Sequence, residues 1–226
     1  MTDHRLSLPE ELLLLGWDDT QGKNRYTQNL PMLLAGAAIL ELVLDDRVTL
    51  TDGKLEAVGP ATGDPALDLV LDRIRSSRRP RSAKAWVQYL GNRRELKADV
   101  MRRLVERGIL REGSGRILGF SVIRLPVIDV NRVDGIRQRV TRVLTQPEPI
   151  GDPRDAMLAS LVQPGGGGLL RRLVPPEQRG ETRKRAKALS KGEAVSAEVV
   201  KAISDANAAI AAVIAATTVA TSSSDS

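Results

Sequence analysis

The segment Leu30–Leu44 constrains the fold more than any other part of the chain, because it is apolar on all sides. Its one charged residue is Glu41. A helix that is hydrophobic all round is buried on all sides, so we expect a central helix that other elements surround. Because Glu41 interrupts the run, the segment is not interpreted as a membrane span of roughly 20 apolar residues.

Helical spacing dominates the rest of the chain. Ser7 and Glu10 have the spacing of a capping box, and the leucine run after them ends near Gly16. Asp52-Gly53 lies between two short apolar runs, which is typical of a β-hairpin. Apolar periodicity predicts further helices over 64–75, 83–90, 96–107, 131–144, 152–162, 175–189 and 196–216. We therefore predict a mostly α fold with one or two small β-hairpins.

The domain organisation predicted from these elements is simple. A single globular helical domain covers 6–216, because no long linker or internal repeat divides it. A flexible N-terminus covers 1–5, and a disordered tail rich in Ser and Thr covers 217–226.

The chemistry available to the chain is narrow. It has no cysteine and its single histidine is His4, so thiol chemistry is excluded and a histidine triad or metal cluster has only a terminal residue to use. The four glycines at 165–168 are followed by Leu169 and lack the Gly-Lys-Ser/Thr of a phosphate loop, so they are interpreted as a flexible connection. We therefore predict no enzyme activity, no metal and no cofactor.

Charge is distributed unevenly along the chain. Residues 1–70 hold 5 basic and 12 acidic side chains, whereas residues 71–110 hold 12 basic and 4 acidic ones. This polarity favours a polyanionic partner, which is a nucleic acid, an anionic membrane or a phosphate head group. Of the 34 basic residues 26 are Arg, which is typical of coding in a GC-rich bacterium.

The helix predicted over 96–107 has two cations at an unusual place. On a helical wheel, Arg94 and Lys97 fall inside its apolar arc, at its N-terminal end. Free backbone N–H groups point the same way, so a bound anion would satisfy these groups and both cations. The alternative is that both side chains extend into solvent over their apolar stems.

The segment 120–128 is the second candidate site, because it holds six apolar side chains around a proline. If it forms a projecting hairpin, its tip exposes an apolar patch between Arg116, Arg124 and Arg132, which suits a membrane or a partner protein. If it is a central pair of strands, the same side chains are core. The candidate contact residues are Phe120, Val122, Ile123, Arg124 and Leu125.

Two alternatives to a membrane protein stay open. A helix, a glycine and a hairpin in succession also describe the end of a winged-helix DNA-binding unit, and the basic loop over 73–81 suits phosphate contacts. The face of the helix that would enter the groove carries Glu95, Asp99 and Glu106, however, and these carboxylates repel the DNA backbone. The other alternative is an interaction scaffold that self-associates through the hairpin.

Four sequence blocks, taken in order, resemble the Golgi phosphoprotein 3 family. They are Leu6–Gly16, Gly36–Leu42 with Arg47, Thr62–Asp68 and Leu104–Leu110. The order and spacing agree from about residue 6 to 190. The resemblance implies a mostly α-helical single domain. It also implies a peripheral membrane protein, since the eukaryotic members bind phosphatidylinositol 4-phosphate at the Golgi and help to retain glycosyltransferases.

The resemblance further implies a lipid site. In the family, an aromatic and three basic residues form the head-group pocket, next to an apolar hairpin that contacts the membrane. By alignment, Tyr26 takes the aromatic position, and Arg94 and Lys97 take two of the basic positions. Ala35 stands at the third basic position, and the hairpin aligns with 120–127.

The leading hypothesis is a peripheral membrane protein that binds an anionic head group through Tyr26, Arg94 and Lys97, with Arg93 nearby. The hairpin inserts shallowly, and protein clients are a further class of partner. We expect no nucleic-acid partner. Because no basic start followed by an apolar run marks a signal peptide, we expect a cytoplasmic protein on the inner face of the membrane.

Overall fold

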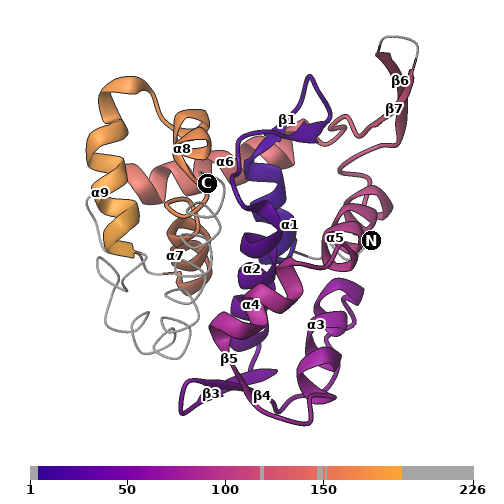
Figure 1. Cartoon of the computed structure of the whole chain (residues 1–226). Helices are drawn as coiled ribbons and strands as arrows, with labels where there is room; N and C mark the ends of the chain where they lie inside the picture. Colours follow the sequence, from indigo (N-terminus) through magenta and orange to yellow (C-terminus); the bar gives the residue numbers. More distant parts are fainter. Residues whose placement is uncertain (1–4, 118–119, 147–149, 151, 190–226) are drawn as a thin grey trace, which may run out of the picture.

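The computed structural model describes residues 5–117, 120–146, 150 and 152–189, and the side chains of 114–123 lie outside this description. The helices in this part of the chain are α1 (Leu8–Leu15), α2 (Leu30–Leu44), α3 (Pro65–Arg75), α4 (Ala83–Gly91), α5 (Glu95–Glu106), α6 (Val130–Thr145), α7 (Pro153–Ser160), α8 (Gly167–Leu173) and α9 (Arg179–Leu189), with a 3-10 turn at Pro176–Gln178. The prediction of a mostly α fold is confirmed (Figure 1).

The strands form small antiparallel sheets. Strand β1 (Trp17–Asp18) pairs with β2 (Lys23–Asn24), and β6 (Gly113–Ile117) pairs with β7 (Phe120–Arg124). The third sheet has the order β3 (Val48–Thr51), β4 (Lys54–Ala57), β5 (Arg81–Ser82). The β1–β2 hairpin has no counterpart among the elements predicted from the sequence, because strands of two residues leave no periodic signal.

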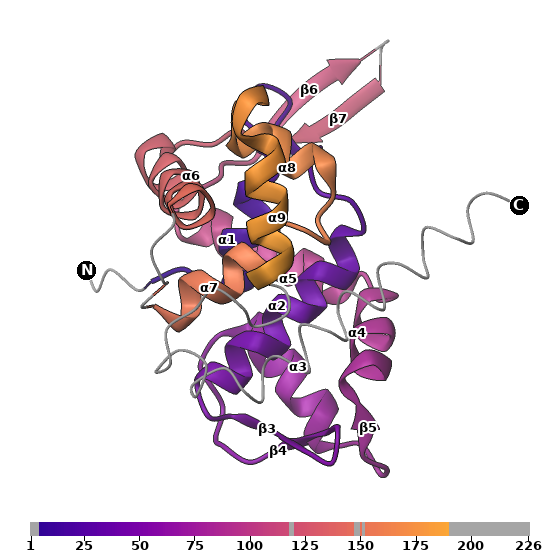
Figure 2. The ribbon, with the colours of Figure 1, turned by 90° about the vertical axis from the view of Figure 1, so that its left-hand side faces the viewer.

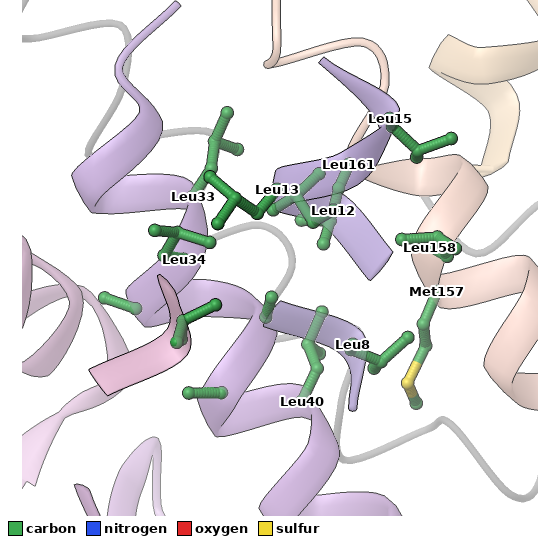
Figure 3. Packing of buried hydrophobic residues seen from close by; sticks show 14 of the residues in the cluster. Leu8, Leu12, Leu13, Leu15, Leu33, Leu34, Leu40, Met157, Leu158 and Leu161 are labelled. Atoms are coloured by element: carbon green, nitrogen blue, oxygen red, sulfur yellow. The ribbon is translucent and has the colours of Figure 1, made fainter. Parts of the chain in front are cut away.

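Helix α2 is the centre of the fold, as its apolar sequence predicts. Its described residues are buried from Leu33 to Val43 without interruption, and α1, α3, α4, α5 and α7 pack against it. Figure 3 shows Leu33, Leu34 and Leu40 of α2 beside the leucines of α1 and, further away, Met157 and Leu158 of α7. The buried apolar side chains form one contiguous cluster from Leu6 to Leu189. No helix in the described part of the chain is long and apolar enough to cross a membrane.

Buried carboxylates of α1 and α2 join the helices across the core. Glu41 is 6% exposed; it pairs with Arg154 of α7 and accepts a hydrogen bond from the backbone N of Leu8 at 2.6 Å. Glu11 is paired at 2.7 Å with Arg139 of α6 and also faces Arg154 at 3.9 Å. These pairs tie the α6–α7 half of the molecule to α1 and α2.

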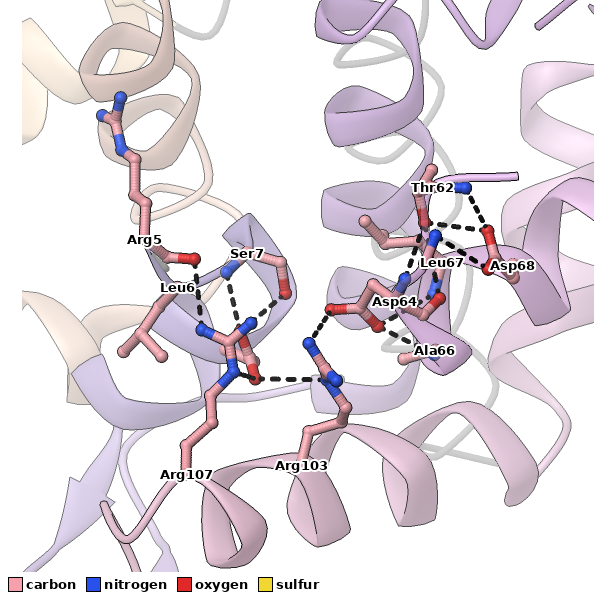
Figure 4. Close-up of polar contacts among 12 residues, drawn as sticks. Arg5, Leu6, Ser7, Thr62, Asp64, Ala66, Leu67, Asp68, Arg103 and Arg107 are labelled. Carbon is pink, nitrogen blue, oxygen red and sulfur yellow. Dashed lines mark hydrogen bonds and ion pairs between the residues drawn. The ribbon is translucent and has the colours of Figure 1, made fainter. Parts of the chain in front are cut away.

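Glu10 completes the predicted capping box and also binds α5. Its Oε2 accepts a hydrogen bond from Ser7 N at 2.7 Å, while its Oε1 lies 3.3 Å from Arg107 Nε. The neighbouring Arg103 pairs with Asp64 at 3.3 Å, and the Asp64 carboxylate caps α3 by accepting from Ala66 N at 2.9 Å (Figure 4). One chain of charges thus positions α5 against the starts of α1 and α3.

The hairpin β6–β7 differs from the prediction. We expected the segment 120–128 to form the hairpin, with its tip near Pro126. The register runs from Gly113 opposite Arg124 to Ile117 opposite Phe120, so Pro126 lies at the root of the hairpin. A Cβ on Gly113 would lie 3.4 Å from the carbonyl oxygen of Arg124, which is an ordinary van der Waals contact, so the strand pairing does not require glycine at this position. The hairpin projects beyond the helices (Figures 1 and 2).

The glycine stretch at 165–168 is more ordered than predicted. We interpreted it as a flexible connection, but α8 begins at Gly167. A Cβ on Gly168 would lie 2.8 Å from the carbonyl oxygen of Tyr26, so the glycine allows α8 to approach the loop before α2. The helix predicted over 196–216 and the tail over 217–226 lie outside the described residues, and the domain limits stay a prediction.

Candidate functional site

The N-terminal end of α5 presents the two cations that the helical wheel selects. Arg94 is the N-cap residue and Lys97 lies in the first turn, and both side chains are exposed. Leu96, Val100 and Leu104 are buried, so the apolar face has the predicted direction. Within the described part of the chain, neither Arg94 nor Lys97 has an ion-pair or hydrogen-bond partner for its side chain.

The link from α4 to α5 lies against the first turn of α2. A Cβ on Gly91 would be 3.0 Å from the Cα of Met32, so only glycine allows this backbone contact. Two residues further on, the guanidinium of Arg93 lies 4.6 Å from the ring centre of Tyr89. A cation over an aromatic face is attracted to the ring. The stacking thus orders Arg93, while Arg94 and Lys97 extend into solvent.

Tyr26 lies in the loop before α2, with a partner that sequence reasoning missed. Its backbone N donates to the carbonyl oxygen of Gly16 at 3.3 Å, and the guanidinium of Arg172 lies 5.3 Å from its ring centre. Arg172 also pairs with Asp19 at 2.8 Å. No local pattern could have indicated Arg172, because it comes from α8, far along the chain.

The structure therefore brings the candidate residues together only in part. Among the described residues, Tyr26 makes no hydrogen bond or ring contact with Arg94 or Lys97; the cation on its ring is Arg172. Ala35 is fully buried inside α2, so this position contributes packing to the core. Both groups follow the chain close to the first turn of α2: Tyr26 precedes Leu30, and Arg94 follows Gly91, which packs against Met32.

Leu125 requires a correction. We expected it to insert into a membrane with the hairpin tip, but it is 6% exposed and lies at the hairpin root. Its carbonyl oxygen accepts from the Trp17 indole at 3.0 Å, and its N donates to the carbonyl oxygen of Gly22 at 3.1 Å. Arg124 is half-buried. The side chains of Phe120, Val122 and Ile123 lie outside the described residues.

The described residues hold no group of three or more His, Cys, Asp or Glu side chains arranged to bind a metal ion. Their notable chemistry is cationic: exposed guanidinium and ammonium groups at a helix N-terminus, with further arginines on aromatic rings. Guanidinium and ammonium groups recognise carboxylates and phosphates, and Arg does so with a planar fork of N–H donors.

The family model for Golgi phosphoprotein 3 (GPP34) matches residues 8–206. The chain belongs to this family, whose proteins are non-enzymatic and bind phosphoinositides. The prediction that the chain is not an enzyme agrees with this class.

Two curated relatives are similar to the chain, and both are called vacuolar protein sorting-associated protein 74. The protein from Schizosaccharomyces pombe is 29% identical over 165 residues, which cover 62% of this chain and 49% of the relative. The protein from Eremothecium gossypii is 26% identical over 163 residues, with the same coverage of both chains. The chain thus spans about half the length of these relatives.

Proposed function

We propose that this chain is a peripheral membrane protein that binds anionic phospholipid head groups at the N-terminal end of α5. The observation that carries the proposal is the exposed pair Arg94 and Lys97, which has no acidic partner among the described residues. Cations at a helix N-terminus are unfavourable beside the positive end of the helix dipole. A phosphate placed there offsets both charges and accepts from the backbone N–H groups.

Neighbouring features support the same surface. Arg93 is ordered on Tyr89, and Tyr26 carries Arg172 on its ring. The hairpin β6–β7 extends away from the helices and supplies a second contact with the bilayer in this proposal (Figure 1). The family binds phosphoinositides, which makes a phosphorylated lipid the first head group to test. The chain then acts on the cytoplasmic face of a membrane.

The double variant Arg94→Ala/Lys97→Ala is expected to partition roughly 30-fold less into anionic vesicles than the wild type. Each basic residue near an anionic surface contributes about 1 kcal/mol, so two contribute about 2 kcal/mol. Co-sedimentation with phosphoinositide-containing vesicles at physiological salt measures this change, and neutral vesicles give the baseline.

The matched control is Arg183→Ala/Lys184→Ala on α9, which removes the same charge from exposed positions on the opposite side of the molecule (Figure 1). This control is expected to bind nearly as the wild type does. If both variants lost vesicle binding equally, the binding would be unspecific electrostatic attraction. If Arg94→Ala/Lys97→Ala lost no vesicle binding, the proposed site would be refuted. Duplex DNA added as a competitor tests the winged-helix alternative, which predicts displacement from the vesicles.

A further inference from the structure

A hollow of about 600 Å³ lies where the chain passes from α3 to α4. Its polar lining consists of the side chains of Arg73, Arg78, Arg79, Arg81, Ser76 and Ser77. Trp86 and Tyr89 of α4 close its apolar side, and no Asp or Glu is among the lining residues. The hollow lies at the β5 end of the molecule, far from the tip of the hairpin β6–β7 (Figures 1 and 2).

The arginines of this hollow are largely uncompensated. The side chains of Arg78 and Arg79 are exposed and have no ion-pair or hydrogen-bond partner within the described part of the chain. Arg73 pairs at 3.3 Å with Glu95, and both of these side chains are about half exposed, so solvent weakens the pair. Of the four arginines that line the hollow, Arg73 alone pairs with a carboxylate within the described part of the chain, and the mutual repulsion of the four guanidinium groups favours a bound anion.

The backbone around the hollow is held at both ends. Arg81 and Ser82 form strand β5, which pairs with β4, and Ser82 Oγ caps α4 by accepting from Ala85 N at 3.3 Å. Inside the loop, Ser77 Oγ donates to the carbonyl oxygen of Arg79 at 2.8 Å. The guanidinium of Arg81 lies over Trp86 and Tyr89, at 5.2 and 5.1 Å from their ring centres. The loop that carries these cations is therefore held in place by backbone pairing, hydrogen bonds and ring contacts.

Trp86 is a buried aromatic residue in the wall of the hollow. Its side chain is 2% exposed, and its indole N–H has no hydrogen-bond acceptor among the described residues. Native proteins rarely leave a buried donor without an acceptor. Because Trp86 lines the hollow, its indole N–H signal can report on a ligand bound there.

We propose that this hollow is a phosphate-binding site, separate from the cations of α5. Its ligand is a phosphorylated small molecule or the phosphorylated head group of a lipid, since both present the oxygen geometry that guanidinium forks match. The guanidinium groups of Arg81 and Arg93 lie over the ring of Tyr89. The ring is therefore not free to stack on a nucleic-acid base. The site does not depend on the function proposed for α5.

Inorganic pyrophosphate added to the full chain tests this site through the two indole N–H signals in a ¹H–¹⁵N spectrum. The chain has two tryptophans, and the indole of Trp17 already donates to Leu125. We expect a saturable shift of the Trp86 signal while the Trp17 signal stays in place. The variant Arg78→Ala/Arg79→Ala is expected to weaken binding by about tenfold or more, because charge-assisted hydrogen bonds are lost.

The charge-preserving variant Arg78→Lys/Arg79→Lys separates a built site from general attraction. Lysine keeps the charge but cannot form the bidentate fork, so we expect pyrophosphate to bind severalfold more weakly than to the wild type. If the lysine variant bound pyrophosphate as tightly as the wild type does, the proposal would be overturned. The absence of a saturable shift of the Trp86 signal would overturn it as well. Loss of duplex DNA binding in Arg78→Ala/Arg79→Ala, with no pyrophosphate shift in the wild type, would also overturn it.

Vesicles containing a phosphoinositide distinguish the two sources of phosphate. If Arg78→Ala/Arg79→Ala loses both pyrophosphate and vesicle binding, the site is supported and its ligand is a lipid head group. If it loses pyrophosphate binding alone, the site is supported and its ligand is soluble. The variant Arg94→Ala/Lys97→Ala is expected to keep pyrophosphate binding at Trp86, so failure of the α5 site and failure of this site are told apart.

Discussion

Replacing Arg154 by alanine is expected to lower the free energy of unfolding by about 3–5 kcal/mol, because breaking a buried ion pair leaves its partner charge uncompensated. Arg154 is 8% exposed, and its guanidinium pairs with Glu41. Its Nη2 donates to the carbonyl oxygen of Leu6 at 2.5 Å. In the alanine variant, the buried carboxylate of Glu41 and the buried carbonyl oxygen of Leu6 therefore lose the guanidinium group that pairs with them at the junction of α1, α2 and α7.

The cost of Arg154→Ala is expected to depend on pH. Burial raises the pKa of Glu41 above its ordinary value of 4.5, while the charge of Arg154 lowers it. Without Arg154 the pKa of Glu41 in the folded state rises further. The folded variant then binds more protons than the unfolded chain between pH 4.5 and that raised value, so its stability rises as the pH falls through this interval.

Urea unfolding of the wild type and Arg154→Ala at about pH 8 and about pH 5 measures both effects, with a smaller difference expected at the lower pH. The control is Arg5→Ala, which breaks the half-exposed pair with Asp152 at 3.4 Å and is expected to cost at most about 1 kcal/mol. A loss in Arg154→Ala no larger than that of the control, or one that is independent of pH, would contradict the role of this pair.

Replacing Gly22 by alanine is expected to destabilise the protein by about 2–4 kcal/mol, which combines backbone strain and overpacking. Gly22 has a φ of +60°, and a Cβ there would lie 2.8 Å from the backbone N of Leu125. The turn between β1 and β2 therefore rests directly on the root of the hairpin β6–β7. The substitution forces the two segments apart and weakens the bond from Leu125 N to the carbonyl oxygen of Gly22.

Gly53 offers a matched control for Gly22→Ala. Its φ is +73°, and an added Cβ would meet no atom within 4 Å. Gly53→Ala should therefore show only the backbone term of about 1 kcal/mol. Thermal unfolding compares the two variants, and proteolysis at the hairpin reports whether its root has loosened. Equal destabilisation in both variants would show that contact with Leu125 contributes nothing.

Short-range signals were sufficient for most helices. The capping box of Ser7 and Glu10, the Asp64 cap before Pro65 and the apolar run of α2 each involve residues within a few positions of one another. Such patterns act in the local chain before any tertiary contact forms, which is why α2 and α3 begin and end where the sequence predicts. Arg94 and Lys97 lie at the N-terminal end of α5, but both side chains are exposed, although the wheel puts them inside the apolar arc. Their binding role stays a prediction.

The hairpin and the site depend on contacts between distant segments. The sequence places Pro126 in the middle of the candidate hairpin segment, but the pairing of Gly113 with Arg124 shows that Pro126 lies at the hairpin root. Leu125 was interpreted as exposed because nothing near it in the sequence points to Trp17. Similarly, Arg172 reaches Tyr26 across most of the chain. An apolar residue in a strand fits a core or a membrane equally well until its neighbours are known.

By itself the sequence determined the helical character of the protein, its central α2, the absence of thiol chemistry and the concentration of positive charge in residues 71–110. Tertiary structure alone decided which charges are buried in pairs and which face solvent. Glu41 and Arg154 are neutralised in the core, whereas Arg78, Arg79, Arg94 and Lys97 face solvent without a partner in the described residues. The physical reason is that the energy of a charge depends on its burial and on the distance to its counter-charge, and folding sets both.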